Sequence, residues 1–261
     1  MEPVLYHGEP NGASLTVLAA LAETGLDLHC KRLDLLAGAR HRLPGITEPI
    51  ALDLGIEGEG PVLVAGGEAM TESVFLAQYF DELAGGCGLQ PSDPYSHWEM
   101  LMWCRQITER LSPAAAMLGN LASSQSEIAA IPARDFVHVA AAIVSDDLRE
   151  RWLALRDGDI SPAQVADSQT KVDQAAQRCE DKLTDGRAFL MGAFSIADLV
   201  TYSWLAGMEL VRPEAFAETP LTRAWLARVA VRPCILAALA MATVPEPLTT
   251  WAPGPEINRW G

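Results

Sequence analysis

The sequence lacks the groupings of cysteine and histidine that build a disulfide framework or a zinc site. Its five cysteines are scattered without a Cys-x-x-Cys pair, and its five histidines do not recur at ligand spacing. Dispersed cysteines in odd number are typical of reduced thiols that pack in a core or lie at a surface. We therefore expect neither a disulfide framework nor a bound metal.

The sequence also lacks a long apolar run and has little positive charge. No stretch reaches the roughly 18 uninterrupted apolar residues of a membrane span, and the N-terminus has no basic region followed by an apolar one, as a secretory signal would. The formal net charge is -15 and the sequence pI is about 4.7. Such a surface repels phosphate backbones and anionic lipids, so we expect a cytoplasmic protein that binds neither nucleic acid nor membranes.

The first third of the chain predicts a small mixed sheet with two helices. Short apolar runs separated by turn-forming residues indicate strands, and apolar residues at helical spacing indicate helices. The order is strand, helix, strand, hairpin and helix, over residues 4–7, 14–24, 28–35, 61–70 and 71–83. This pattern predicts a βαβ–ββα domain over residues 1–84.

A change in composition separates this domain from the rest of the chain. Residues 85–94 are rich in glycine and proline and are the best candidate for a linker. No strand pattern returns after them, and helical patterns cover residues 95–123, 132–157, 161–183, 195–210 and 220–242. We therefore expect an all-helical domain over residues 95–261, in which the segment from Pro245 onward is an extended cover.

A capping box at Ser195 and Asp198 is the strongest local signal in the sequence. The Ser195 side chain can accept a hydrogen bond from the N–H of Asp198, whose carboxylate can accept one from the N–H of Ser195. Because this arrangement is a common helix start, we interpret the pair as a folding device and not as a catalytic Ser/Asp pair.

The residues around this capping box resemble the glutathione transferase superfamily. The string FLMGAFSIAD, from Phe189 to Asp198, is similar to the start of the buried helix in the C-terminal domain of that family. A second match lies at the expected distance and resembles the family's last helix: Pro220-Leu221, Ala224-Trp225-Leu226 and Arg232-Pro233. The resemblance covers nearly the whole chain and implies a thioredoxin-like N-terminal domain followed by an all-α C-terminal domain.

The resemblance also implies a glutathione site in the N-terminal domain. In the family, the bond before the proline at Pro61 is cis, and the backbone at Val62 pairs with the cysteinyl part of glutathione like a sheet edge. Glu72 and Ser73 would hold the γ-glutamyl ammonium and carboxylate at the start of a helix. The alternative interpretation is an ordinary hairpin that leads into a capped helix.

The family places its thiol-activating residue near Asn11 and Ser14. A hydroxyl or amide at a helix N-terminus can donate to a thiolate and lower its pKa, and the helix dipole helps. Ser14 is the main catalytic candidate, and Asn11 is the weaker one. Ser14 also fits a structural role as the N-cap of its helix, and the two roles are compatible.

Within the superfamily, the C-terminal half resembles the bacterial β-etherases, which cleave β-aryl ethers derived from lignin. The resembling segments are residues 89–95, 102–103, 131–132 and 151–158. The resemblance implies that a hydrophobic aromatic ether binds between the two domains. The candidates to line its site are Trp103, Met117 and Trp204, together with Trp251 of the extended cover, and burial in the core is the alternative for each.

Several residues depart from the family pattern. Ala13 stands where the β-etherases closest in pattern have Asn, and Gly60 replaces the usual Val before the proline. Glu57 and Glu59 lie beside a site for an anionic tripeptide, and they would weaken its binding unless nearby arginines offset their charge.

Three hypotheses remain open at this point. The first is a glutathione-dependent β-etherase, with glutathione as co-substrate and no metal. The second is a catalytically degenerate subunit that stabilises an active paralogue in a heterodimer. The third is a general detoxifying glutathione transferase or peroxidase. The resemblance implies a dimer in each case, either of identical chains or with a paralogue.

Overall fold

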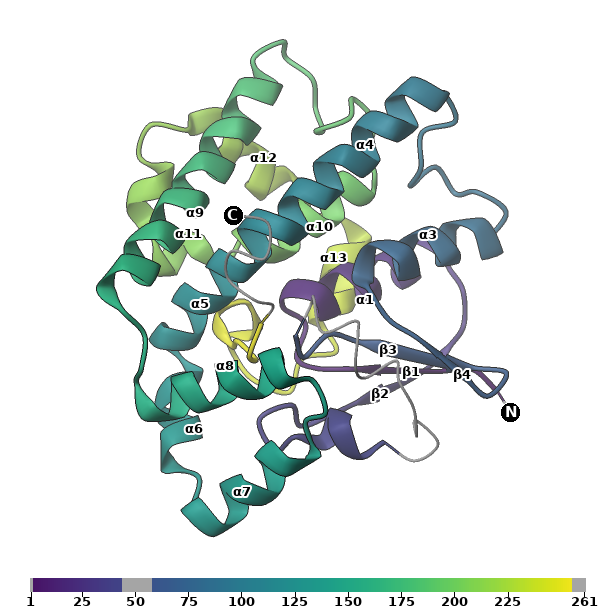
Figure 1. The fold of residues 1–261 in the computed structure, drawn as a ribbon. Coiled ribbons are helices and arrows are strands. Elements are labelled where there is room, and N and C mark those ends of the chain that lie inside the picture. The colour runs from purple at the N-terminus through teal and green to yellow at the C-terminus, as the bar shows by residue number, and fades with distance from the viewer. Residues whose placement is uncertain (1, 44–57, 255–261) are drawn as a thin grey trace.

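The structure is a computed structural model that describes residues 2–43 and 58–254. It contains a four-stranded sheet made of β1 (Val4–His7), β2 (His29–Arg32), β3 (Val62–Ala65) and β4 (Glu68–Met70). The sheet order is β2-β1-β3-β4; β1 is parallel to β2, and the other neighbours are antiparallel. Helices α1 (Gly12–Thr24) and α3 (Ser73–Leu83) pack together on one side of the sheet (Figure 1). The predicted βαβ–ββα order of a thioredoxin-like domain is confirmed.

The remainder of the chain is helical, as the sequence predicts. Its α-helices are α4 (Pro94–Gln106), α5 (Ser112–Ala122), α6 (Ser124–Ala130), α7 (Ala133–Ala142), α8 (Asp146–Asp157), α9 (Pro162–Leu183), α10 (Ile196–Leu205), α11 (Met208–Val211), α12 (Pro220–Ala230) and α13 (Pro233–Leu239). A π-helical turn, η3 (Ile107–Leu111), joins α4 to α5. Short 3-10 turns are η1 (Ala39–Arg42), η4 (Pro213–Phe216) and η5 (Pro247–Thr249). The linker and domain boundary at residues 85–94 stay predictions.

Several helical segments differ from the sequence-based expectation. Residues 195–210 hold two helices, α10 and α11, and residues 220–242 hold α12 and α13. The single helix predicted over residues 132–157 is two helices, α7 and α8, because Ser145 is an N-cap whose side chain accepts from the Leu148 N–H. Helix α6 was not predicted at all. It follows α5 with a break at Ser123, whose backbone leaves the helical region.

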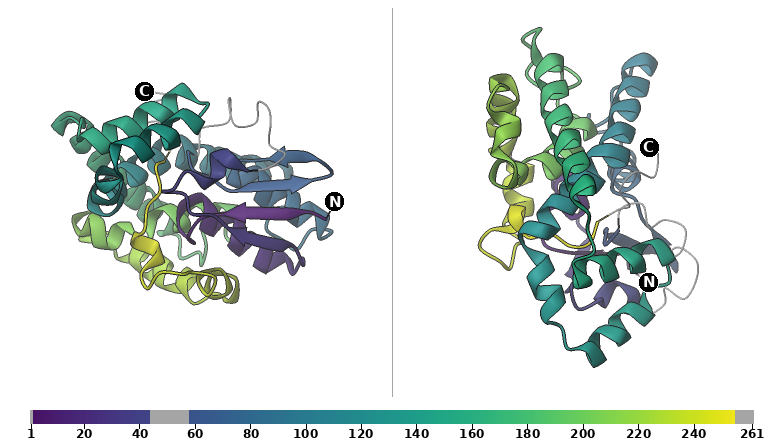
Figure 2. Two further views of the ribbon diagram at one scale, coloured as in Figure 1. Left: turned by 90° about the horizontal axis from the view of Figure 1, so that it is seen from below. Right: turned by 60° about the vertical axis from the view of Figure 1, so that its left-hand side comes forward.

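The hydrophobic core consists of two clusters of buried side chains, one large and one small. The larger one joins both parts of the chain, since α1 packs against α3 and also against α10 and α13. The smaller one lies beneath α6, α7 and α8 around the fully buried Trp152. Residues 243–254, called the tail below, run between the helical part and the sheet (Figure 2, left). Among the described residues, no helix is long and apolar enough to cross a membrane.

The surroundings of the cysteine side chains do not favour reactive thiolates. All five are free, and three of them, Cys104, Cys179 and Cys234, are buried. Burial raises the pKa of each of these three thiols far above its ordinary value. Burial and then a hydrogen bond to Asp81 raise the pKa of the exposed Cys87 to about 11. The predicted division into core and surface cysteines agrees with this arrangement.

The capping box at the start of α10 forms as predicted and does more than cap a helix. The fully buried Asp198 carboxylate accepts from the backbone N–H groups of Leu190 and Ser195, at 2.9 Å and 3.0 Å, and from the indole N–H of Trp225 at 2.9 Å. Burial raises the pKa of Asp198 to about 6, although these hydrogen bonds act in the opposite direction. One side chain therefore connects the loop before α10, the α10 N-terminus and α12.

Replacing Asp198 should destabilise the protein far more than replacing an exposed cap. Asp198→Ala would leave buried N–H donors without an acceptor, so we expect a loss of about 3 kcal/mol in the free energy of unfolding. The control is Asp93→Ala, which removes an exposed N-cap of α4 and should cost much less stability than Asp198→Ala. Urea denaturation measures both, and equal losses would refute the connecting role of Asp198.

Candidate functional site

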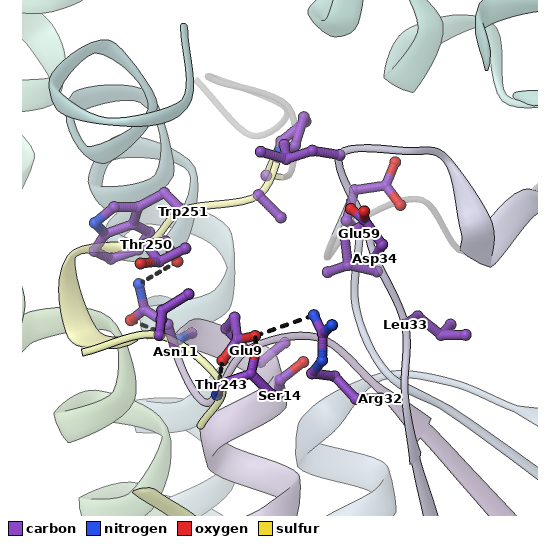
Figure 3. A pocket seen from close by; sticks show the side chains of 18 of the residues that line it. Glu9, Asn11, Ser14, Arg32, Leu33, Asp34, Glu59, Thr243, Thr250 and Trp251 are labelled. Atoms are coloured by element: carbon purple, nitrogen blue, oxygen red, sulfur yellow. Dashed lines mark hydrogen bonds and ion pairs between the residues drawn. The ribbon is translucent and has the colours of Figure 1, made fainter. Parts of the chain in front are cut away.

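A cavity of about 310 Å³ lies where the N-terminus of α1, the end of β2 and the tail meet (Figure 3). We call it the α1 cavity. It is lined by backbone and side chains of residues 9, 11–14, 32–36, 59, 127, 204, 243–244 and 250–254. Its size falls at the lower end of the range for small-molecule sites. Residues far apart in the sequence therefore converge on one space beside the start of a helix.

Ser14 lies in the wall of this cavity and is not the N-cap of α1. Its Oγ accepts a hydrogen bond from the Gly8 N–H at 3.0 Å, and no acceptor among the described residues takes its proton. A Cβ at Gly8 would lie 2.3 Å from Leu35 Cδ1, so a larger residue there would require the Leu35 side chain to move. The Gly8 contact fixes Ser14 Oγ and leaves the hydroxyl proton available to a ligand.

Asn11 is the true N-cap of α1, and both ends of its side chain are engaged. Oδ1 accepts from the Gly12 N–H at 2.9 Å, and Nδ2 donates to the Thr250 carbonyl at 3.2 Å. The interpretation of Ser14 as the N-cap is therefore wrong. The amide of Asn11 caps the helix and holds the tail, which leaves it little to offer a thiolate.

The start of α1 presents a positive potential to the cavity. The first backbone N–H groups of a helix have no intrahelical acceptor, and the helix dipole places partial positive charge there. Ala13 and Ser14 line the cavity at this end. Gly12 has φ +48° and lies against the Trp204 ring, 2.9 Å from the position that a Cβ would occupy. Ala13, which replaces the Asn of related enzymes, adds no side-chain donor here.

The tail closes the cavity on the side opposite the sheet. The ring of Trp251 packs on that of Trp204, with centroids 6.0 Å apart. Asn120 donates to the Ala252 carbonyl at 3.1 Å, and the Pro253 carbonyl accepts from the Glu59 N–H at 3.0 Å. The tail thus covers one side of the α1 cavity, and the role of Trp251 in a substrate site stays a prediction.

The residues expected to cradle glutathione do not line the α1 cavity. Pro61 is buried, Val62 belongs to β3 and pairs with Tyr6 of β1, and Ser73 is fully buried. No peptide bond in the described part of the chain is cis, so the cis bond implied for Pro61 is wrong. The Gly60 carbonyl before it is held instead by the Arg40 guanidinium, whose Nε donates to it at 2.9 Å.

The backbone conformation of Glu72 still points to a ligand site at the start of α3. Glu72 has φ 69° and is the single non-glycine with positive φ among residues 2–43 and 58–254. This region costs a non-glycine residue about 1 kcal/mol or more, and such strain concentrates at ligand sites.

The three residues expected to line the aromatic site separate into three places. Trp204 lines the α1 cavity, and its role in an aromatic-substrate site stays a prediction. Met117 lines a second cavity of about 250 Å³ between α5 and α8. Trp103 borders a small space beside α9, and its indole N–H donates to Thr201 Oγ1 at 2.9 Å. Trp103 and Met117 therefore do not join Trp204 in one site.

Sequence reasoning missed the polar residues at the mouth of the cavity. Arg32, at the end of β2, forms an ion pair with Glu9 at 3.1 Å, and Glu9 also accepts from the Thr243 N–H and hydroxyl (Figure 3). Asp34 follows in the same loop. The sequence could have indicated these residues. Arg32 and Asp34 follow a strand, and residues at the end of a strand lie at the same edge of the sheet as the start of a neighbouring helix.

The chain was compared with protein families and solved structures. Residues 144–233 match the family described as "Glutathione S-transferase, C-terminal domain". Over about nine tenths of its length the chain has the fold of glutathione transferase structures. No curated protein matches the sequence at a significant level.

Structures of glutathione transferases align with almost the entire chain. The β-etherase LigF from Sphingobium sp. strain SYK-6 has 23% sequence identity and a TM-score of 0.79, with 92% of this chain and 99% of that chain covered. Glutathione transferase F7 from Populus trichocarpa has 20% identity and a TM-score of 0.62, with 91% and 99% covered. A glutathione transferase family member from Pseudomonas fluorescens pf-5, crystallised with two glutathione bound, has 16% identity and a TM-score of 0.62, with 91% and 92% covered.

Filling the space next to Trp251 should release the tail. A Cβ added at Gly119 in α5 would lie 2.3 Å from the Trp251 ring. Alanine improves helix propensity by about 1 kcal/mol over glycine, so Gly119→Ala would stabilise the protein if the tail did not dock there. We expect lower stability and faster proteolysis within residues 243–254.

The double variant Gly119→Ala/Trp251→Ala is the matched control. Without the Trp251 ring, Gly119→Ala should leave the free energy of unfolding unchanged or increase it. The difference between the two backgrounds is the coupling energy of residue 119 and the Trp251 ring. Independent, additive effects of the two substitutions would contradict the docked position of the tail.

Proposed function

We propose that the chain is a glutathione-dependent transferase of the β-etherase type, with the α1 cavity as its reaction site. The observation that carries the proposal is the free proton of Ser14, presented at the start of α1 beside the apolar wall of Trp204 and Trp251. A thiolate and an aromatic substrate require such neighbouring polar and apolar surfaces. The fold shared with LigF, described as a β-etherase, supports the choice of this reaction.

In the proposed reaction, the glutathione thiolate attacks the carbon that bears the aryloxy group, next to a ketone. A C–S bond forms while the C–O bond breaks, and the electron pair of that bond leaves with the phenolate. The ketone makes the carbon electrophilic. The thiol proton is lost before the attack, so the protein has to favour the thiolate near neutral pH.

The residues of the α1 cavity supply this stabilisation. The Ser14 hydroxyl donates to the thiolate, since its Oγ already accepts from Gly8 and its proton has no other acceptor among the described residues. The positive end of α1 adds to the effect. The rings of Trp204 and Trp251 hold the aryl group by apolar contact, which aligns the C–O bond with the sulfur.

Glu72 and Ser73 remain the proposed holders of the γ-glutamyl group. They begin α3, an eleven-residue helix, and the strained backbone at Glu72 supports a ligand role. The sheet-edge pairing at Val62 is not part of the proposal, because it depended on a cis bond before Pro61.

The degenerate-subunit hypothesis is the second candidate, and the charge of the cavity favours it. Arg40 is directed to the Gly60 carbonyl and His41 to Glu59, so neither residue is left to bind a carboxylate of glutathione. Retention of the purified chain on immobilised glutathione separates the two hypotheses, since a degenerate subunit would pass through. A general detoxifying enzyme would be retained but would prefer aryl halides to aryl ethers.

Ser14→Ala should raise the pKa of the bound thiol and slow turnover at neutral pH. The loss of one hydrogen bond to a charged sulfur predicts a decrease of about 10- to 100-fold in kcat. Turnover of a β-aryl ether ketone and the ultraviolet absorbance of the thiolate measure the two effects.

The matched control is Thr16→Val in the same helix. Thr16 is also a buried hydroxyl, but it donates to the Gly12 carbonyl and does not line the cavity. If Ser14→Ala and Thr16→Val leave turnover equally unchanged, Ser14 does not activate the thiol.

We also propose a dimer of two copies of this chain, formed through α3 and α4. Phe75, Tyr79 and Leu83 lie one helical turn apart on α3 and are 66%, 37% and 54% exposed. Tyr95 and Trp98 of α4 are 67% and 54% exposed and have their ring centroids 5.7 Å apart. Exposed aromatic side chains grouped in this way are typical of interfaces and not of a solvated helix face.

Light scattering of the purified chain tests this interface. The wild type should have the mass of two chains, and Phe75→Glu/Trp98→Glu should have the mass of one. Leu210→Glu, at a site that is 71% exposed on α11, should remain a dimer. A monomeric wild type would contradict the proposal and would favour a heterodimer with a paralogue.

A further inference from the structure

A further cavity, of about 560 Å³, is lined by residues of α10, α11 and α12, and we call it the α12 groove. It shares no lining residue with the α1 cavity. Four alanines, Ala206, Ala224, Ala227 and Ala230, contribute to its wall, and Leu248 of the tail lines it as well. The volume falls within the range of small-molecule sites, and the small methyl groups leave room for a flat apolar ring beside them.

Three polar side chains line this groove without bonding to one another. They are Tyr202 of α10, Glu209 of α11 and Arg223 of α12, so each of the three helices contributes one. In the part of the chain that the structure describes, none of these side chains forms a hydrogen bond or an ion pair. The groove therefore holds a donor hydroxyl, a carboxylate and a guanidinium, none of which is engaged by the protein.

Tyr202 is the buried member of this group. The residue is 3% exposed, and a phenolic hydroxyl in such a position normally has a hydrogen-bond partner. Burial, and then the charge of Glu209, raise the pKa of Tyr202 to about 12, so its hydroxyl keeps its proton at neutral pH. Burial also raises the pKa of Glu209, and the charge of Arg223 opposes this effect. Each group thus acts electrostatically on its neighbour across a gap that is wider than a hydrogen bond.

A neutral hydroxyl group is the ligand group that fits this gap best, because a hydroxyl both donates and accepts. It can accept from the Tyr202 hydroxyl or the Arg223 guanidinium and donate to the Glu209 carboxylate. A ligand carboxylate would be attracted by Arg223 but repelled by Glu209, and the reverse holds for an ammonium group. Neither ion can therefore use all three side chains.

We propose that the α12 groove binds a neutral phenol, with its ring against the alanine wall and its hydroxyl between Tyr202, Glu209 and Arg223. The site goes beyond the proposed glutathione chemistry and does not depend on it, since the two cavities share no lining residue. Leu248 belongs to the tail that also covers the α1 cavity, so an occupant of the groove would contact this tail.

Titration with 2-naphthol, a flat two-ring phenol, tests the proposal. Calorimetry of the full-length chain at neutral pH should show saturable binding that is at least tenfold tighter than that of 2-naphthoate, which carries a carboxylate on the same rings. Tyr202→Phe removes one hydrogen bond to the ligand and should weaken the binding of 2-naphthol about fivefold. Glu209→Gln removes the repulsion of the carboxylate, so the preference for 2-naphthol over 2-naphthoate should decrease.

A pair of tryptophan substitutions locates the bound ligand. Ala227→Trp, at an exposed position of α12, fills the groove and should abolish the binding of 2-naphthol. Ala141→Trp, at an exposed position of α7 outside the groove, should leave it unchanged. The proposal is overturned if 2-naphthol does not bind at millimolar concentration or if 2-naphthoate binds more tightly. Binding that persists unchanged in both Ala227→Trp and Tyr202→Phe would place the ligand elsewhere and would also overturn it.

Discussion

The buried side chain of Glu59 connects three segments on which the shape of the candidate site depends. Its carboxylate contacts His41 of η1 and accepts from Trp152 of α8, while its backbone N–H donates to Pro253 of the tail. A buried charge is stable only with such partners. Because these contacts tie the sheet, the helical part and the tail together, they set the width of the cavity beside α1.

The tail makes a site out of what would otherwise be an open crevice. It is fixed at its middle by Asn11 and Asn120, and its Trp251 ring fills the space above Gly119. Asn11 is also the cap of α1, so the residue that starts the helix also anchors the cover over its end. The tail therefore brings an apolar wall next to the Ser14 hydroxyl and the positive end of the α1 dipole. Thiolate chemistry requires this combination.

The order of strands and helices could be predicted from the sequence because neighbouring residues determine most of these elements, and the tertiary structure keeps them. The alternation of strands and helices in the first third, and the capping box at Ser195, are each determined by near neighbours. The break before α8 was missed because the apolar spacing continues across Ser145 and hides the cap.

The site was predicted only in part. The family resemblance made Ser14 a candidate, but its partner Gly8 and the lining by Glu9 and Arg32 depend on contacts between segments. Trp103 and Met117 share one long helical segment in the sequence, and the structure places them beside different cavities.

The central claim is that the α1 cavity holds the thiol of the co-substrate against Ser14. A crystal structure of the chain grown with glutathione tests it most directly. The account predicts the sulfur within hydrogen-bond distance of Ser14 Oγ, with the rest of the ligand between α1 and the tail. A ligand bound solely in the cavity lined by Met117, or a sulfur directed away from Ser14, would contradict the account.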